Sequence, residues 1–295
     1  MALTLQGTYT ALVTPFTADG SLDLESLAKL CEWQIASGVD GLVPCGSTGE
    51  AATLSHEEHV RVVKHVVEVA GRRVPVIAGA GSNSTREAIE LTQAARAAGA
   101  DAALLISPYY NKPTQEGIFQ NYRAVAQETR LPILTYNVPG RTASRIESET
   151  TARLSRVPGV AGLKECGGDL IATSETLAQV APGFAVLCGD DALTLPMLEI
   201  GARGAISTVA NVAPAAAAEL IRAHGSGDHA RARKLHYELL PITQSLFVEA
   251  NPIPVKTALA ILGRIPCPAL RLPLTEISKA NRERLEAVLA ELPRT

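Results

Sequence analysis

The strongest constraint on the fold of this chain is a repeated unit, in which a short apolar segment precedes a longer helical segment. Short apolar runs between turn residues are typical of buried strands. We expect strands at 9–13, 41–45, 74–78, 102–106, 132–136, 160–165, 184–188 and 204–207. A helical pattern follows each strand after a short connection. Eight such units predict an α/β fold, a closed parallel (β/α)8 TIM barrel.

One of the predicted helices carries clear signals at its start. Ser55 and Glu58 form the pattern of a capping box, in which each side chain bonds the backbone N–H of the other residue. Val60, Val63 and Val67 follow at intervals of three and four residues. We therefore predict that these three valines form the buried stripe of the helix.

The strand pattern stops after residue 226. The remaining chain reads as helices at 228–248, 255–262 and 275–292, separated by proline-rich joints. We therefore predict two parts: a (β/α)8 barrel at 1–226 that carries the active site, and a C-terminal helical appendage at 227–295.

The composition argues against several classes of protein. The chain of 295 residues has a net charge of -3, which gives no reason to expect binding to nucleic acid or to a membrane surface. Its apolar runs are interrupted before the ~20 residues that a membrane-spanning helix needs. Five scattered cysteines without paired spacing fit reduced thiols, and no signal peptide is evident. We expect a cytoplasmic protein.

Polar side chains gather where the predicted strands end. Ser47 and Thr48 follow the second strand, Tyr110 follows the fourth, Tyr136 ends the fifth, and Lys164 lies near the end of the sixth. In parallel barrels, the loops at these strand ends carry the functional groups. Buried hydroxyl groups also need hydrogen-bond partners, so packing alone does not account for this set. The strand ends therefore indicate an active site around one lysine.

Lys164 is unusual because it closes an apolar strand, and lysine is among the residues least often buried. One explanation is structural: its amine reaches the surface or pairs with a carboxylate such as Glu165 or Asp190. The other is catalytic, since partial burial disfavours the charged form and makes the amine a nucleophile. The sequence of this strand alone leaves both explanations open.

Other kinds of site fit the sequence less well. The segment 46–49 lies between a strand and a helix and could bind phosphate, but it lacks the lysine of a P-loop. His56 and His59 are three residues apart, where the zinc-protease motif has four, and a third ligand is not evident. We therefore expect no metal site.

Several segments together resemble the class I pyruvate-dependent aldolases and lyases. They are 46–50, 107–117, 136–142, 162–165 and 251–256. The resemblance extends from Gly7 to the last predicted helix. Its details are most similar to the branch that condenses pyruvate with L-aspartate 4-semialdehyde, the first committed step of lysine and diaminopimelate biosynthesis.

The resemblance implies a role for each polar residue at the strand ends. Lys164 would form a Schiff base with pyruvate, which requires neither a metal nor an organic cofactor. Tyr136 would transfer protons, and Thr48 would link it to Tyr110 of a neighbouring subunit. These hydroxyl groups both donate and accept hydrogen bonds, as a proton relay requires.

The same resemblance implies the substrate-binding residues. Arg141 would bind the carboxylate of aspartate semialdehyde with its planar guanidinium group. Backbone groups of Gly189 and Ile206 would contact pyruvate, and Ser47 and Thr48 would line the site. Ser47 replaces the threonine that is usual at its position, which keeps the hydroxyl group and loses a methyl group.

The resemblance also implies a homotetramer, built as a dimer of dimers, and inhibition by L-lysine. The inhibitor site would be formed by Ala51, Ala52, His56, His59, Asn83, Glu87 and Tyr109. In this site Glu87 would pair with the amine of the inhibitor. Tyr109 precedes Tyr110 directly, so a ligand there could disturb the proton relay through the backbone.

Two other functions remain open from the sequence. A lyase of the same family would cleave N-acetylneuraminate or a 2-keto-3-deoxy sugar acid and release pyruvate. A non-catalytic barrel would only bind a keto acid. The second alternative fits less well because the lysine and the hydroxyl groups are all present.

Overall fold

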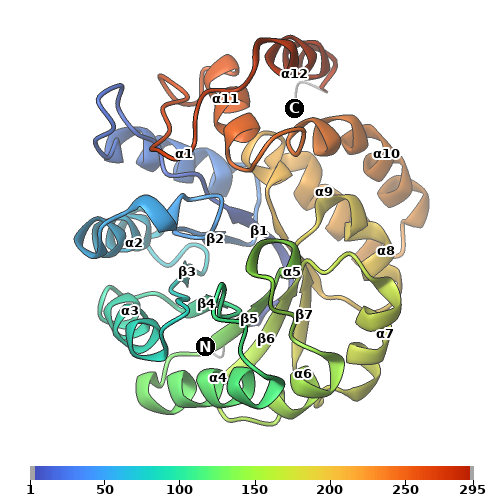
Figure 1. The fold of residues 1–295 in the computed structure, drawn as a ribbon. Coiled ribbons are helices and arrows are strands. Elements are labelled where there is room, and N and C mark those ends of the chain that lie inside the picture. Colours follow the sequence, from blue (N-terminus) through green and yellow to red (C-terminus); the bar gives the residue numbers. More distant parts are fainter. Residues whose placement is uncertain (1–3, 293–295) are drawn as a thin grey trace.

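The computed structural model describes residues 4–292, and in these residues eight parallel strands form a barrel ringed by helices (Figure 1). The strands are β1 (Gly7–Ala11), β2 (Gly41–Val43), β3 (Ile77–Gly79), β4 (Ala102–Ile106), β5 (Ile133–Asn137), β6 (Val160–Glu165), β7 (Ala185–Cys188) and β8 (Gly204–Ser207). The predicted (β/α)8 architecture is confirmed.

The barrel closes between β2 and β3 with fewer contacts than elsewhere. All other neighbouring strands pair in the order β2-β1-β8-β7-β6-β5-β4-β3. At the remaining gap a single bridge joins Leu42 to Val76. The Leu42 N–H donates to the Pro75 carbonyl at 3.0 Å, and the Gly79 N–H donates to the Pro44 carbonyl at 2.9 Å. These bonds complete the ring.

Helices connect the strands and cover the outside of the barrel, except the short helix after β5, which lies over the end of the barrel (Figure 1). They are α1 (Leu24–Ala36), α2 (His56–Ala70), α3 (Thr85–Ala97), α4 (Gln115–Thr129), α5 (Pro139–Thr142), α6 (Ser148–Leu154), α7 (Leu170–Gln179), α8 (Thr194–Glu199) and α9 (Pro214–Gly225). One apolar core lies between the strands and these helices, and a smaller one fills the inside of the barrel. None of the described helices is both long and apolar enough to cross a membrane.

The predicted start of α2 is confirmed, but its buried face is not the one predicted. Ser55 and Glu58 make both bonds of the capping box. The buried stripe is formed by Val62, Val63 and Val66, whereas Val60 and Val67 are only half-buried. Valines lie on several sides of this helix, so their spacing alone could not determine which side faces the barrel.

Three further helices follow the barrel, namely α10 (His229–Ser245), α11 (Ile253–Ile261) and α12 (Lys279–Glu291). The last of them starts at Lys279, later than the predicted residue 275, because the Ser278 side chain accepts a hydrogen bond from the Asn281 N–H and caps the helix there. In Figure 1 this region lies along the upper edge of the barrel, with α10 against α9.

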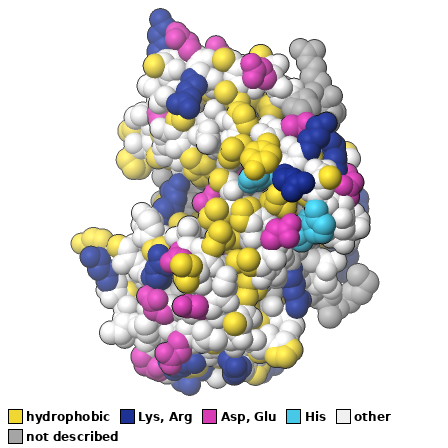
Figure 2. Space-filling model, turned by 90° about the vertical axis from the view of Figure 1, so that its right-hand side faces the viewer, with side chains coloured by type: hydrophobic (Ala, Val, Ile, Leu, Met, Phe, Trp, Pro, Cys, Tyr) yellow, Lys and Arg dark blue, Asp and Glu magenta, His cyan; other side chains and the backbone are white. Residues whose placement is uncertain are grey.

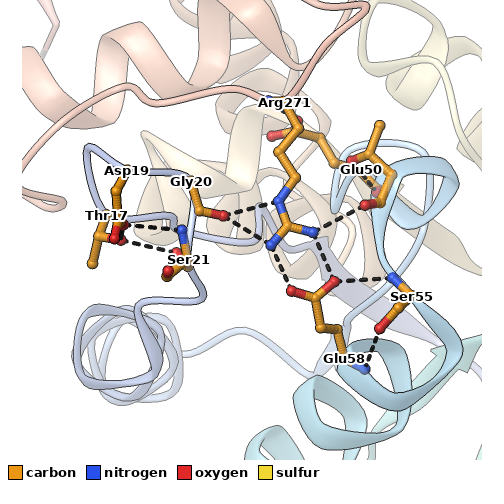
Figure 3. Close-up of polar contacts among 9 residues, drawn as sticks. Thr17, Asp19, Gly20, Ser21, Glu50, Ser55, Glu58 and Arg271 are labelled. Atoms are coloured by element: carbon orange, nitrogen blue, oxygen red, sulfur yellow. Dashed lines mark hydrogen bonds and ion pairs between the residues drawn. The ribbon is translucent and has the colours of Figure 1, made fainter.

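Arg271 connects the segment before α12 to the loop that contains Gly20 and to the residues at and before the start of α2 (Figure 3). Its guanidinium group makes two hydrogen bonds with the Glu58 carboxylate, at 2.6 and 2.7 Å, and also donates to the carbonyls of Gly20 and Thr53. The hydrogen bonds from Arg271 hold the pKa of Glu58 at about 2. This charge-assisted contact joins residues more than two hundred positions apart in the sequence.

Glu50 makes a second contact between the two parts of the chain. Its carboxylate lies 2.7 Å from the Lys256 amine on α11, and both side chains are completely buried. The second carboxylate oxygen of Glu50 accepts a hydrogen bond from the Arg271 backbone N–H at 3.2 Å. The Lys256 amine also lies 4.1 Å from the centre of the Phe16 ring. The loop after β2 is therefore fixed by a fully buried ion pair.

Candidate active site

Lys164 and Tyr136 lie side by side at the carboxyl ends of two neighbouring strands. They occupy paired positions on β6 and β5. The Lys164 amine lies 4.3 Å from the centre of the Tyr136 ring. Both residues are buried, with 7% of each exposed. The structure thus places the predicted nucleophile directly against the predicted proton-transfer residue.

Burial lowers the pKa of the Lys164 amine, because the charged form loses its hydration. The nearby Cys166 and Asp191 oppose this effect only in part. Lys164 makes no ion pair with the carboxylates of Glu165 or Asp190 among the described residues, which leaves the ion-pair explanation of its burial without support. A lysine of this kind offers a larger fraction of neutral, nucleophilic amine near neutral pH.

Gly189 makes room for the Lys164 side chain. A Cβ atom at this position would lie 2.6 Å from Lys164 Cε and 2.1 Å from Cys166 Sγ, well inside contact distance. Gly189, one of the two residues predicted to contact pyruvate, thus lies directly against Lys164. The contact with pyruvate itself stays a prediction. The side chain of Ile206, the other residue of that pair, is fully buried in the core inside the barrel.

Tyr136 forms part of the wall of a cavity of about 500 Å³. Burial raises the pKa of its hydroxyl group well above the ordinary value, while the positive charge of Arg141 and the nearby Ser47 side chain act in the opposite direction. Ser47 and Arg141 also line the cavity, and Lys164 stands behind Tyr136. A small molecule in this cavity would contact the side chains of Ser47, Tyr136 and Arg141, close to the Lys164 amine.

Thr48 makes a contact that the predicted proton relay does not include, and its place in that relay stays a prediction. Its hydroxyl oxygen accepts a hydrogen bond from the Asn251 side chain at 2.8 Å, and no hydrogen bond joins it to either tyrosine among the described residues. Ser47 lies beside Tyr136 instead. Adjacent residues in this tight loop thus make different contacts, which makes Ser47 a second candidate for the link to Tyr136.

Tyr110 does not reach the other site residues within its own chain. Its side chain is 88% exposed, and its backbone adopts a left-handed conformation with φ of 71°. Such a conformation is uncommon for a bulky residue and costs energy. The fold thus holds a large aromatic side chain outward, into solvent, at the carboxyl end of the barrel.

Arg141 lies on the short helix α5 at the wall of the cavity. One of its guanidinium nitrogens donates to the Asn251 carbonyl at 3.3 Å. Asn251 itself is buried, and its side-chain oxygen has no hydrogen-bond partner in the described structure. The family-like segment 251–256 does not by itself assign a role to Asn251. The structure shows that it connects Thr48 to Arg141.

Most of the predicted lysine-site residues line the same cavity. They are Ala51, Ala52, His56, His59, Glu87 and Tyr109. Asn83 lies near the others, since its carbonyl accepts a hydrogen bond from Asn111 at 2.9 Å, but it is not part of the cavity wall. The cavity therefore extends from the Tyr136 hydroxyl group to the faces of α2 and α3.

The two histidines of this group lie in different environments. His56 is exposed, and its Nε2 atom lies 2.8 Å from the Glu87 carboxylate. His59 is buried, and its Nε2 atom lies 2.7 Å from the Gly79 carbonyl. Burial lowers the pKa of His59, which favours its neutral form. Glu87 also accepts a short hydrogen bond from Ser82, which contributes to the lowering of its own pKa.

Asp191 was missed as a member of the site because no motif signals it. Its carboxylate accepts hydrogen bonds from the Ser207 hydroxyl group and from the backbone N–H groups of Thr208 and Val209. Burial raises the pKa of Asp191, and its charge acts on Lys164. It thus ties the loop after β7 to the end of β8 behind the lysine.

The comparison with known proteins agrees with this geometry. Residues 4–292 match the dihydrodipicolinate synthetase family. A protein of Nitratidesulfovibrio vulgaris named 4-hydroxy-tetrahydrodipicolinate synthase is 53% identical over 285 residues, which cover 96% of this chain and 97% of the relative.

Two solved structures of dihydrodipicolinate synthases are also similar. One, from Acinetobacter baumannii, is complexed with pyruvate; it is 45% identical, covers 98% of this chain and 99% of its own, and has a TM-score of 0.96. The other, from Cyanidioschyzon merolae, has lysine bound; it is 37% identical over 98% of both chains, with a TM-score of 0.94. The chain belongs to the dihydrodipicolinate synthetase family and is a lyase.

Proposed function

We propose that this chain condenses pyruvate with L-aspartate 4-semialdehyde to give 4-hydroxy-tetrahydrodipicolinate. The observation that carries the proposal is the buried Lys164 amine, held 4.3 Å from the centre of the Tyr136 ring beside a cavity lined by Arg141. The pyruvate complex and the curated names of the relatives support it. In this proposal the Lys164 amine reacts with the ketone of pyruvate, and the Arg141 guanidinium group binds the carboxylate of aspartate semialdehyde.

In the proposed reaction, the neutral Lys164 amine attacks the ketone carbon of pyruvate, and a water molecule leaves as the imine forms. The protonated imine attracts electrons, so the pyruvate methyl group can lose a proton and become an enamine. The enamine carbon then forms a bond with the aldehyde carbon of aspartate semialdehyde, whose oxygen takes up a proton. The amine of that substrate finally displaces Lys164 and closes the ring.

Tyr136 and Ser47 transfer the protons of these steps in our proposal. The Tyr136 ring lies against the Lys164 amine, and burial keeps the Tyr136 hydroxyl group protonated at neutral pH. Ser47 passes the proton onward to Tyr110 of a neighbouring subunit. Arg141 binds the carboxylate of the aldehyde substrate at the cavity wall, where its contact with the Asn251 carbonyl orients it.

An assay with alternative substrates tests the proposed function. The purified enzyme is supplied with pyruvate and aspartate semialdehyde in one reaction, and with N-acetylneuraminate or a 2-keto-3-deoxy sugar acid in others. We expect turnover only in the first reaction. Release of pyruvate from a sugar acid at a higher kcat/KM would instead identify the chain as an aldolase of the same family.

The two candidates for the link to Tyr136, Ser47 and Thr48, can be separated by substitution. Ser47→Ala removes the hydroxyl group beside Tyr136, so we expect kcat to fall by on the order of a hundredfold while the stability is unchanged. Thr48→Val instead leaves the buried amide of Asn251 without a partner and should cost about 1–3 kcal/mol of stability. Steady-state kinetics and urea unfolding measure both. A larger loss of kcat in Thr48→Val would identify Thr48 as the link instead.

We also propose that the enzyme is a homotetramer formed by two dimers. The exposed, left-handed Tyr110 supports one interface, because its side chain is held away from its own site. A band of hydrophobic side chains on the face with α7, α8 and α10 supports the other (Figure 2). On these elements and directly after α8, Ile171, Tyr237 and Ile200 are 75%, 63% and 38% exposed.

Mixing two inactive variants tests whether Tyr110 acts across an interface. Tyr110→Phe and Lys164→Ala damage different members of the site, so one site of each hybrid dimer should contain both intact residues. Random exchange makes half of the dimers hybrids, and we expect about a quarter of wild-type activity. Activity that stays at the level of the separate variants after subunit exchange, or a fully active monomer in sedimentation, would contradict the proposal.

We propose further that L-lysine inhibits the enzyme by binding where α2 and α3 face the cavity. Ala51, His56, Glu87 and Tyr109 line this region, and the lysine-bound relative supports the assignment. Glu87 is the only one of these side chains that is an acid, so it would pair with the amine of the ligand. The Glu87 carboxylate now bonds His56 and Ser82, and the amine of the ligand would either replace one of these partners or bind beside them.

Glu87→Ala should relieve inhibition by lysine without abolishing activity. Loss of the charge-assisted bond should raise the lysine concentration for half-inhibition by about ten- to a hundredfold, which corresponds to 1.5–3 kcal/mol. Glu90→Ala, an exposed acid on the same helix, is the matched control. The measurement is a lysine titration at fixed substrate. Equal inhibition of wild type and Glu87→Ala would show that L-lysine does not bind at Glu87.

A further inference from the structure

Two histidines and a glutamate meet on the outer surface of the barrel, far from the cavity. Glu199 is the last residue of α8, His224 lies in the last turn of α9, and His229 is the first residue of α10. The chain turns sharply between the two histidines, where Gly227 has a φ of 84°. Three separate helices thus bring one ligand atom each to a common point.

The contacts in this cluster are longer than those of a closed ion pair between an imidazolium group and a carboxylate. The Glu199 Oε1 atom lies 3.3 Å from His229 Nδ1 and 3.6 Å from His224 Nε2. An imidazolium bonded to a carboxylate would close to about 2.7–2.9 Å. In the described structure none of the three side chains makes another hydrogen bond. The two ion pairs are therefore open, and the exposed side chains of Glu199 and His229 are accessible to a further ligand.

The two distances from Glu199 are close to those between the ligand atoms of one tetrahedral metal ion. Zinc binds histidine nitrogen and carboxylate oxygen at about 2.0–2.1 Å, so two ligand atoms of one tetrahedron lie about 3.3–3.4 Å apart. All three atoms of the cluster lie within 4.8 Å of one another. The rings of His224 and His229 are nearly perpendicular, at 83°, with their centres 5.3 Å apart. Their nitrogen atoms can therefore point at one ion without the rings stacking.

We propose that Glu199, His224 and His229 bind one Zn²⁺ ion, with water in the fourth position. The partial exposure of Glu199 and His229 leaves room for that water. Imidazole and carboxylate ligands suit zinc, and the single carboxylate offsets part of the charge of the ion. The ion would join the last barrel helices α8 and α9 to the first helix of the C-terminal region.

Zinc titration of the complete enzyme tests the proposal. After EDTA treatment and dialysis, calorimetry with ZnCl₂ should show saturable binding of one ion per chain at this site. His224→Gln and His229→Gln should each weaken that binding by at least about tenfold. His65→Gln on α2 is the matched control and should bind zinc as the wild type does.

The absorption spectrum of bound Co²⁺ reports on the metal ligands themselves, so a change in protein stability alone would not alter it. Co²⁺ bound by a tetrahedral set of nitrogen and oxygen ligands absorbs visible light, so wild type and His65→Gln should gain a band that both cluster variants lack. Zinc should also raise the Tm of the wild type, because it binds only the folded chain. Absence of saturable binding, or binding that is unchanged in both His224→Gln and His229→Gln, would overturn the proposal.

Discussion

Lys164→Ala is expected to lower kcat by on the order of a thousandfold or more, because the covalent route through the imine is lost. Lys64→Ala, which removes an exposed lysine on α2, should leave kcat unchanged. The Lys164 variant should unfold at the same denaturant concentration as the wild type or a higher one. Removing an amine whose burial disfavours its charge relieves a cost of the folded state.

The pH dependence of imine formation provides a second readout of the same prediction. Burial lowers the pKa of Lys164, so the neutral amine persists to lower pH than that of an ordinary lysine. Imine formation with pyruvate should therefore continue well below the pKa of an exposed amine.

A Lys164→Ala enzyme with more than a tenth of wild-type kcat would contradict the assigned role.

Lys256→Met is expected to be the most destabilising of the substitutions considered, at a cost of about 3–5 kcal/mol. The Glu50 carboxylate would remain fully buried without the amine that now lies 2.7 Å away. It would retain the hydrogen bond from the Arg271 backbone, which does not replace a charge. The loop after β2 should also loosen, since Glu50 follows directly on the segment that carries Ser47.

A double variant shows whether the uncompensated charge causes this loss. Glu50→Gln together with Lys256→Met removes both charges and keeps an acceptor for the Arg271 N–H, so it should be less destabilised than Lys256→Met alone. Urea unfolding of the wild type, the two single variants and the double variant measures the coupling. A Lys256→Met variant within 1 kcal/mol of wild type would show that the ion pair matters little for stability.

The barrel could be predicted because its signals are local and repeated. The strands β4, β6 and β8 have the predicted limits, since each is an apolar run between turn residues. The side of α2 that faces the barrel could not be predicted, because valines occur around the helix. The start of α12 depended on the cap at Ser278, which the pattern of apolar residues does not reveal.

The candidate site was predictable where a residue sits on a strand and less so where it sits in a loop. Lys164 and Tyr136 occupy paired strand positions, and their meeting follows from the topology. Ser47 and Thr48 lie in a tight loop, where one step along the chain reverses the direction of a side chain. The bond between Thr48 and Asn251 spans 203 residues, so no local pattern could indicate it.

Trapping of the imine tests the central claim most directly. The enzyme is incubated with pyruvate, reduced with borohydride, digested and analysed by mass spectrometry. The account predicts one pyruvate-derived adduct per chain, on the peptide that contains Lys164, and none in Lys164→Ala. An adduct on Lys256 or Lys112 with Lys164 unmodified, or no adduct at all, would contradict it.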